Sequence, residues 1–132
     1  EAKRFAGTAK YKIIFDKPTG NANDWVLDLG RVCESAGVKI NGRYVGTLWC
    51  LPFQMPVGKF LRQGKNRLEV EVTNLSANRI ADLDRRKVIW KKFYEINFVN
   101  IRYRKFDASG WPAMDSGLLG PVRLIPASRL SK

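Results

Sequence analysis

Apolar and polar residues alternate along several short stretches of the chain, a pattern typical of β-strands that bury one face. Four such stretches lie at 8–15, 25–30, 67–74 and 120–126. The clearest is RLEVEVTN at 67–74, whose apolar residues are Leu68, Val70 and Val72. We expect these three side chains to point into a core, and those of Glu69 and Glu71 to point into solvent.

The other three stretches show the same pattern with variations. In WVLDLG at 25–30, every second residue from Trp25 to Leu29 is apolar. TAKYKIIF at 8–15 alternates and then becomes continuously apolar, as a strand entering a core would. GPVRLIP at 120–126 repeats the alternation, with Val122 and Leu124 on the inward face.

A hairpin is predicted at VKINGRYVGTLW, residues 38–49. Asn-Gly between two alternating runs favours a two-residue type I′ turn, which needs a positive φ at both central residues. With Asn41 and Gly42 in the turn, Ile40 pairs with Arg43.

Counting outward from this turn places Cys33 opposite Cys50, at a position where side chains approach closely. A cross-strand disulfide is therefore geometrically conceivable, but a bulge at Gly46 would break the register. Two free, buried cysteines that behave as small hydrophobic residues are the preferred interpretation.

Short strands separated by turn signals every 8–12 residues predict an all-β sandwich or barrel. Only residues 79–95 could be helical, because Ile80, Leu83, Trp90 and Tyr94 share a helical face that Lys87 interrupts. The segment fits an extended conformation equally well, so we expect at most one short helix, within that range. Without internal repeats or a linker, residues 1–132 are predicted to form a single domain.

The composition narrows the possible functions. The chain carries 24 Lys and Arg against 12 Asp and Glu, a net charge of +12 with a pI near 10.1, which favours anionic partners. It contains no histidine, which excludes Ser-His-Asp and Cys-His nucleophiles and His-ligated metals. No apolar run approaches the ~20 residues of a membrane span. The chain begins at Glu1, and we expect it to be processed or part of a longer polypeptide.

Two alternative functions start from charged residues. The basic and aromatic segment 84–106 would suit a nucleic-acid-binding β-barrel, since cations neutralise phosphates and aromatic rings stack on bases. A small autonomous glycosidase would need only two carboxylates. The candidates for that role are Asp82, Asp84, Glu95, Asp107 and Asp115. Surface ion pairs explain these acids more simply, and we expect no catalytic residue in this chain.

The loop DASGWPAMDSGLLG, residues 107–120, is the candidate for binding carbohydrate. An exposed indole such as that of Trp111 can stack on a sugar ring, while the carboxylates of Asp107 and Asp115 accept hydroxyl hydrogen bonds. The alternative is that Trp111 covers one end of the core.

Residues 25–74 resemble the jelly-roll sugar-binding domain of family two glycoside hydrolases. The resemblance lies in WVLDLG, the V-x-I-N-G-R-x-V-G-T hairpin and the strand G-x-N-x-L-x-V-x-V-T-N. ANRIAD at 77–82 and SGLLGPVRL at 116–124 resemble more narrowly the C-terminal β-sandwich of bacterial α-L-rhamnosidase-type enzymes. Together the likeness covers Tyr11 to Pro126.

This resemblance implies an all-β, galactose-binding-like jelly-roll sandwich that accompanies a catalytic domain of the same polypeptide, in the periplasm or outside the cell. Many such domains pack on the catalytic barrel without binding free sugar. We expect no cofactor, metal or membrane partner, and nucleic acid only under the alternative given above. If carbohydrate binds, the resemblance and the loop together suggest Asn78, Arg79, Asp82, Trp111 and Asp115. Arg79 and Asp82 are expected to form an ion pair.

Overall fold

The computed structural model describes residues 4–20, 22–91 and 104–128 of the 132-residue chain. By its internal contacts the chain divides into two compact units. Unit 1 combines Glu1–Ala6 with Leu75–Asp115, and unit 2 combines Gly7–Asn74 with Ser116–Lys132. The prediction of a single domain over 1–132 stays a prediction.

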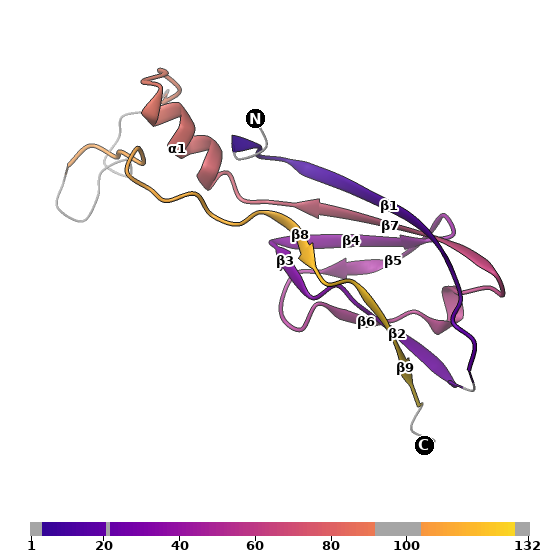
Figure 1. The fold of residues 1–132 in the computed structure, drawn as a ribbon. Helices are drawn as coiled ribbons and strands as arrows, with labels where there is room; N and C mark the ends of the chain where they lie inside the picture. The colour runs from indigo at the N-terminus through magenta and orange to yellow at the C-terminus, as the bar shows by residue number, and fades with distance from the viewer. Residues whose placement is uncertain (1–3, 21, 92–103, 129–132) are drawn as a thin grey trace. The chain divides into compact units, whose positions relative to one another are not determined.

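Unit 2 is built from β-strands in three antiparallel sheets (Figure 1). The largest sheet has the order β1 (Thr8–Asp16), β7 (Lys65–Thr73), β4 (Ser35–Ile40), β5 (Arg43–Leu48). The second has the order β6 (Gln54–Pro56), β2 (Asp24–Asp28), β9 (Arg123–Ala127). A third pairs β3 (Arg31–Cys33) with β8 (Gly117–Gly120), and a short 3-10 helix, η2, covers Gly58–Phe60. The predicted all-β jelly-roll sandwich is confirmed.

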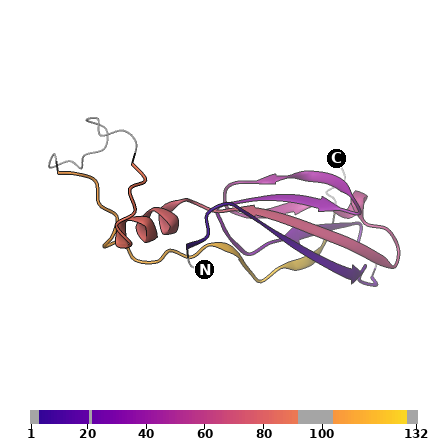
Figure 2. The same cartoon turned by 90° about the horizontal axis from the view of Figure 1, so that it is seen from above.

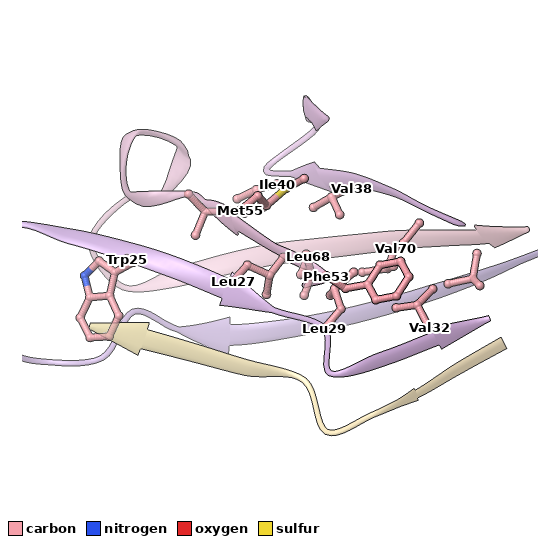
Figure 3. Packing of buried hydrophobic residues seen from close by; sticks show 13 residues of the cluster. Trp25, Leu27, Leu29, Val32, Val38, Ile40, Phe53, Met55, Leu68 and Val70 are labelled. Atoms are coloured by element: carbon pink, nitrogen blue, oxygen red, sulfur yellow. The ribbon is translucent and has the colours of Figure 1, made fainter. Parts of the chain in front are cut away.

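The core of unit 2 lies between the two larger sheets, where side chains from facing strands meet (Figure 3). Strand β2 and the residue after it contribute Trp25, Leu27 and Leu29, all at most 5% exposed. Strands β4 and β7 supply aliphatic side chains from the opposite sheet, and Phe53 and Met55 come from the β6 segment. The alternation predicted for 25–30 and 67–74 is confirmed, because the apolar residues of both stretches point into this core.

The hairpin between β4 and β5 has the predicted turn. Asn41 has φ 52° and Gly42 has φ 79°, and Ile40 pairs with Arg43. The register then shifts between Val38 and Lys39, so that Val38 pairs with Gly46.

This shift removes the predicted pairing of Cys33 with Cys50. Both cysteines are free, as the preferred interpretation has it. The expectation that both are buried is wrong for one of them, because Cys33 is buried and Cys50 is exposed.

The prediction that β1 enters the core with its continuous apolar residues is wrong for Ile13 and Ile14. The strand pairs with β7 along its whole length, yet Ile13 is 57% exposed and Ile14 67% exposed. The reason is that β1 is an edge strand of its sheet. The expectation that Val122 points inward is also wrong. Val122 lies just before β9 and is 41% exposed, whereas Leu124 packs against the core.

Glu69 was expected in solvent but is 7% exposed. It faces outward from β7, where the guanidinium of Arg67 donates a hydrogen bond to its carboxylate and the ammonium of Lys12 lies 3.7 Å away. The hydrogen bond from Arg67 holds the pKa of Glu69 below its ordinary value, against the opposing effect of burial. The long cationic side chains cover the carboxylate without removing it from the outer face.

Candidate functional site

The candidate site lies in unit 1, which contains the one α-helix of the described residues, α1 (Ala77–Arg85). Its end explains why the helical pattern does not continue to Trp90. Lys87 has a left-handed φ of 56°. The N–H of Lys87 donates to the carbonyl of Asp84 (3.0 Å), and that of Val88 donates to Leu83 (2.9 Å). These two bonds form a Schellman motif, which satisfies the last carbonyls and ends the helix. The prediction of at most one short helix is confirmed, although it begins two residues before 79.

A buried carboxylate at the end of this helix joins three segments of unit 1. The Asp84 side chain is 7% exposed. It accepts hydrogen bonds from the indole Nε1 of Trp90 (2.7 Å) and the backbone N–H of Ala108 (2.8 Å), and the Nζ of Lys91 lies 3.1 Å away. Burial alone would raise the pKa of Asp84, but these three donors outweigh it and lower the pKa. Asp84 is therefore a structural centre that is charged at neutral pH.

Three aromatic rings form a ladder beside Asp84. Phe106 contacts Trp90 edge-on at 6.4 Å between ring centroids and Trp111 at 5.6 Å. The ammonium of Lys91 lies 5.3 Å from the ring centre of Trp90 and donates to the carbonyl of Phe106 at 2.7 Å. Trp111 ends the ladder and is 40% exposed. The ring is thus held at its edge and remains accessible to a ligand.

The backbone that carries Trp111 and Asp115 is fastened to α1 at two points. Asn78 is 8% exposed, and its side-chain amide donates to the carbonyl of Met114 (2.7 Å) and accepts from its N–H (2.8 Å). The guanidinium of Arg85 donates to the carbonyls of Ser109 (2.9 Å) and Trp111. These bonds fix the return segment that the sequence marked as a candidate loop.

The five predicted site residues all belong to unit 1, but they do not form one cluster. Asn78 fixes Met114, which is next to the exposed Asp115. Asp82 does not form the predicted ion pair with Arg79; its carboxylate lies 2.9 Å from Arg86 and 3.9 Å from Arg4. Arg86 is four residues on and adjacent to Asp82 on the helix surface, and Arg79 is exposed. Among the described residues, no hydrogen bond, ion pair or ring contact joins Arg79 or Asp82 to Trp111.

A pocket of about 570 Å³ lies beside Asp84. The sequence did not predict a site with this set of residues. The pocket falls within the ~300–1,000 Å³ of ordinary ligand pockets. None of the five predicted residues lines it. Its ionic and aromatic lining consists of Asp84, Arg85, Lys87, Trp90, Lys91, Phe106 and Asp107. The mixture of basic and aromatic residues in segment 84–106 could have indicated this pocket. In the sequence it suggested only the nucleic-acid alternative.

Several cations of that segment are engaged within unit 1. Arg85 binds carbonyls, Arg86 pairs with Asp82, and Lys91 pairs with Asp84. The predicted phosphate contacts from 92–103, and the candidate carboxylate Glu95, lie outside the described residues.

Within residues 4–20, 22–91 and 104–128, no three His, Cys, Asp or Glu side chains group closely enough to hold a metal ion. In the same ranges, no helix is long and apolar enough to cross a membrane.

The chain is similar to segments of much larger glycoside hydrolases. A Formosa agariphila protein described as "Putative beta-glucuronidase" is 36% identical over 142 residues, covering 92% of this chain and 12% of that protein. The structure of a rhamnosidase from Novosphingobium sp. PP1Y is 35% identical with a TM-score of 0.69, covering 92% of this chain and 11% of that one. No protein-family model matches the chain.

A third protein shares the fold alone. The β-D-mannosidase of Dictyoglomus thermophilum is 16% identical and matches 92% of this chain and 16% of that one with a TM-score of 0.56. The chain spans about an eighth or less of the Formosa and Novosphingobium proteins. The resemblance to domains of family two glycoside hydrolases and bacterial rhamnosidases is confirmed, since 92% of this chain is similar to a short segment of each of the two long proteins.

Proposed function

We propose that this chain is a non-catalytic accessory domain of a glycoside hydrolase, which packs on the catalytic domain of the same polypeptide and contacts carbohydrate through unit 1. The observation that carries the proposal is the match of 92% of this chain to a small part of two long proteins, one named a rhamnosidase and the other a glucuronidase. The location that goes with this function is the periplasm or the cell exterior, where polysaccharides are hydrolysed.

The carbohydrate contact is supported by the chemistry of the return segment. Trp111 presents 40% of its surface, and its ring is fixed by Phe106 and its carbonyl by Arg85. A rigid aromatic face suits the apolar C–H face of a pyranose, and the exposed carboxylate of Asp115 is an acceptor on the same segment. Rhamnose and glucuronate are the sugars to test, because the names of the two relatives point to them.

The test is isothermal titration of the chain with rhamnose and with glucuronate, comparing the natural sequence with Trp111→Ala. We expect affinity to fall about 2–10-fold, the scale of ~0.5–1.5 kcal/mol for an aromatic contact. Trp49→Ala is the matched control, since Trp49 lies in unit 2 and is 76% exposed. Its replacement should leave sugar binding unchanged.

Three outcomes would contradict the proposal. Sugar binding that is lost equally in both tryptophan variants would remove Trp111 from the site. A lowered melting temperature for Trp111→Ala without a change in affinity would make the ring structural. Salt-sensitive binding of single-stranded DNA or RNA, with no binding of either sugar, would favour the nucleic-acid alternative instead.

A further inference from the structure

An apolar groove of about 450 Å³ opens in unit 2, and none of the residues assigned to carbohydrate lines it. Five strands line it, including the edge strands β1 and β9. The apolar residues include Tyr11, Ile13 and Phe15 of β1 and Leu27, Leu118 and Leu124 of the strands opposite. Figure 2 shows β1 in indigo and β9 in yellow along this side. The groove is thus lined by strands of both larger sheets.

The apolar side chains of this groove are exposed to an unusual degree. Ile13 is 57% exposed, Val122 41% and Tyr11 38%. Isolated exposed apolar residues are ordinary on a protein surface, but a contiguous set in a groove is typical of an interaction site. The Tyr11 hydroxyl accepts a hydrogen bond from the backbone of Leu118 at 3.3 Å, which holds the first part of the groove together.

The groove is bordered by two strands with open edges. Among the described residues, β1 pairs only with β7, and β9 pairs only with β2. Each strand therefore presents a row of N–H and C=O groups on its other edge. Strand β1 is nine residues long and carries apolar side chains at its centre, so an uncovered edge there would invite aggregation. An extended segment that pairs with such an edge and inserts alternate side chains satisfies both the backbone and the groove.

We propose that an extended strand from the remaining part of the same polypeptide pairs with β1 and fills this groove. The proposal rests on the proposed function, in which the chain is one domain of a longer glycosidase. In the Formosa and Novosphingobium proteins, the matched segment is only 12% and 11% of the chain, so a long polypeptide is available to supply the strand. A tethered strand also binds at high effective concentration.

Charge adds a property of the incoming strand. The charged residues that line the groove are Lys12, whose ammonium lies 3.7 Å from the carboxylate of Glu69, and Arg123. A strand whose inward residues are apolar and whose border residues are acidic matches this lining. A neutral or basic strand would leave the cation of Arg123 facing an apolar partner.

Hydrogen exchange of the β1 amides that point away from β7 tests the proposal. We expect these amides to exchange at least 100-fold more slowly in the longer polypeptide than in the 132-residue chain. Equal rates in the two proteins would overturn the proposal.

Two neighbouring isoleucines provide a matched pair of variants. Ile13 lines the groove, whereas Ile14 pairs with Arg67 on the opposite face of β1 and is also exposed. In the longer polypeptide, Ile13→Asp should abolish the added protection and Ile14→Asp should keep it. Both variants should give the same circular dichroism as the natural 132-residue chain, because both side chains are exposed there. Equal loss of protection in the two variants would refute the assignment of the groove.

The remaining outcomes separate this proposal from its rivals. A dimer of the 132-residue chain in analytical ultracentrifugation that Ile13→Asp dissociates would place a second copy in the groove and overturn the proposal. An active glycosidase with unprotected β1 amides would overturn the strand and leave the proposed function standing. Protected amides in a polypeptide without glycosidase activity would support the strand and overturn the proposed function.

Discussion

Replacing Asp84 with alanine is expected to open unit 1 and leave the sandwich of unit 2 intact. The carboxylate holds the end of α1, the segment with Trp90 and Lys91, and the backbone at Ala108 together. Its side chain is 7% exposed and that of Lys91 is 20% exposed, so the ion pair is largely buried. Breaking such a pair by removing one partner costs about 3–5 kcal/mol, because the remaining charge is left without compensation.

Hydrogen exchange of single amides measures this cost locally. A loss of about 3–5 kcal/mol corresponds to exchange that is two to four powers of ten faster, at ~1.4 kcal/mol per tenfold change. The amide of Ala108 should show the effect directly, since it donates to Asp84. The amide of Val70, in the core of unit 2, should exchange at its original rate.

A nearby carboxylate provides the control. Asp107 is exposed, and its hydrogen bonds come from a single nearby residue, Ser109, whose backbone N–H donates to it at 2.8 Å and whose side chain also bonds to it. Asp107→Ala should accelerate exchange in unit 1 much less than Asp84→Ala does. If the two variants have equal effects, or if Asp84→Ala changes the rates by less than tenfold, Asp84 does not hold unit 1 together.

Three further results are expected. Because the folded-state pKa of Asp84 is lowered, its stabilising effect should be fully present above about pH 4 and be lost as the pH falls through that lower pKa; Asp84→Asn should remove this dependence of unit 1 exchange on pH. Gly42→Val should destabilise unit 2 by about 1–3 kcal/mol in thermal unfolding, since Gly42 has φ 79°; Gly110→Val, where an added Cβ also meets open space, should have little effect. In the native chain, a thiol reagent should modify Cys50 at once and Cys33 only on unfolding, and two fast thiols or none would contradict the structure.

Local sequence determined the parts of the fold whose partners are close along the chain. The turn at Asn41-Gly42 needs only two residues that tolerate a positive φ, and the structure has both. The alternation in β2 and β7 assigned the inward residues correctly, because each strand has one buried face. Local sequence did not determine the register of the whole hairpin, since a single shift near Val38 separated the two cysteines.

Tertiary structure alone decided the features that depend on distant residues. Alternation predicted that β1 is a strand, but only the sheet order shows that it is an edge strand with Ile13 exposed. In the sequence, Asp84 is one of several acidic residues. It is the centre of unit 1 because folding brings the N–H of Ala108, 24 residues away, to its carboxylate. The side-chain type of Trp111 suggested stacking, whereas its accessibility depends on Phe106 and Arg85. Patterns of period two report which way a side chain points, and they carry no information on what lies opposite.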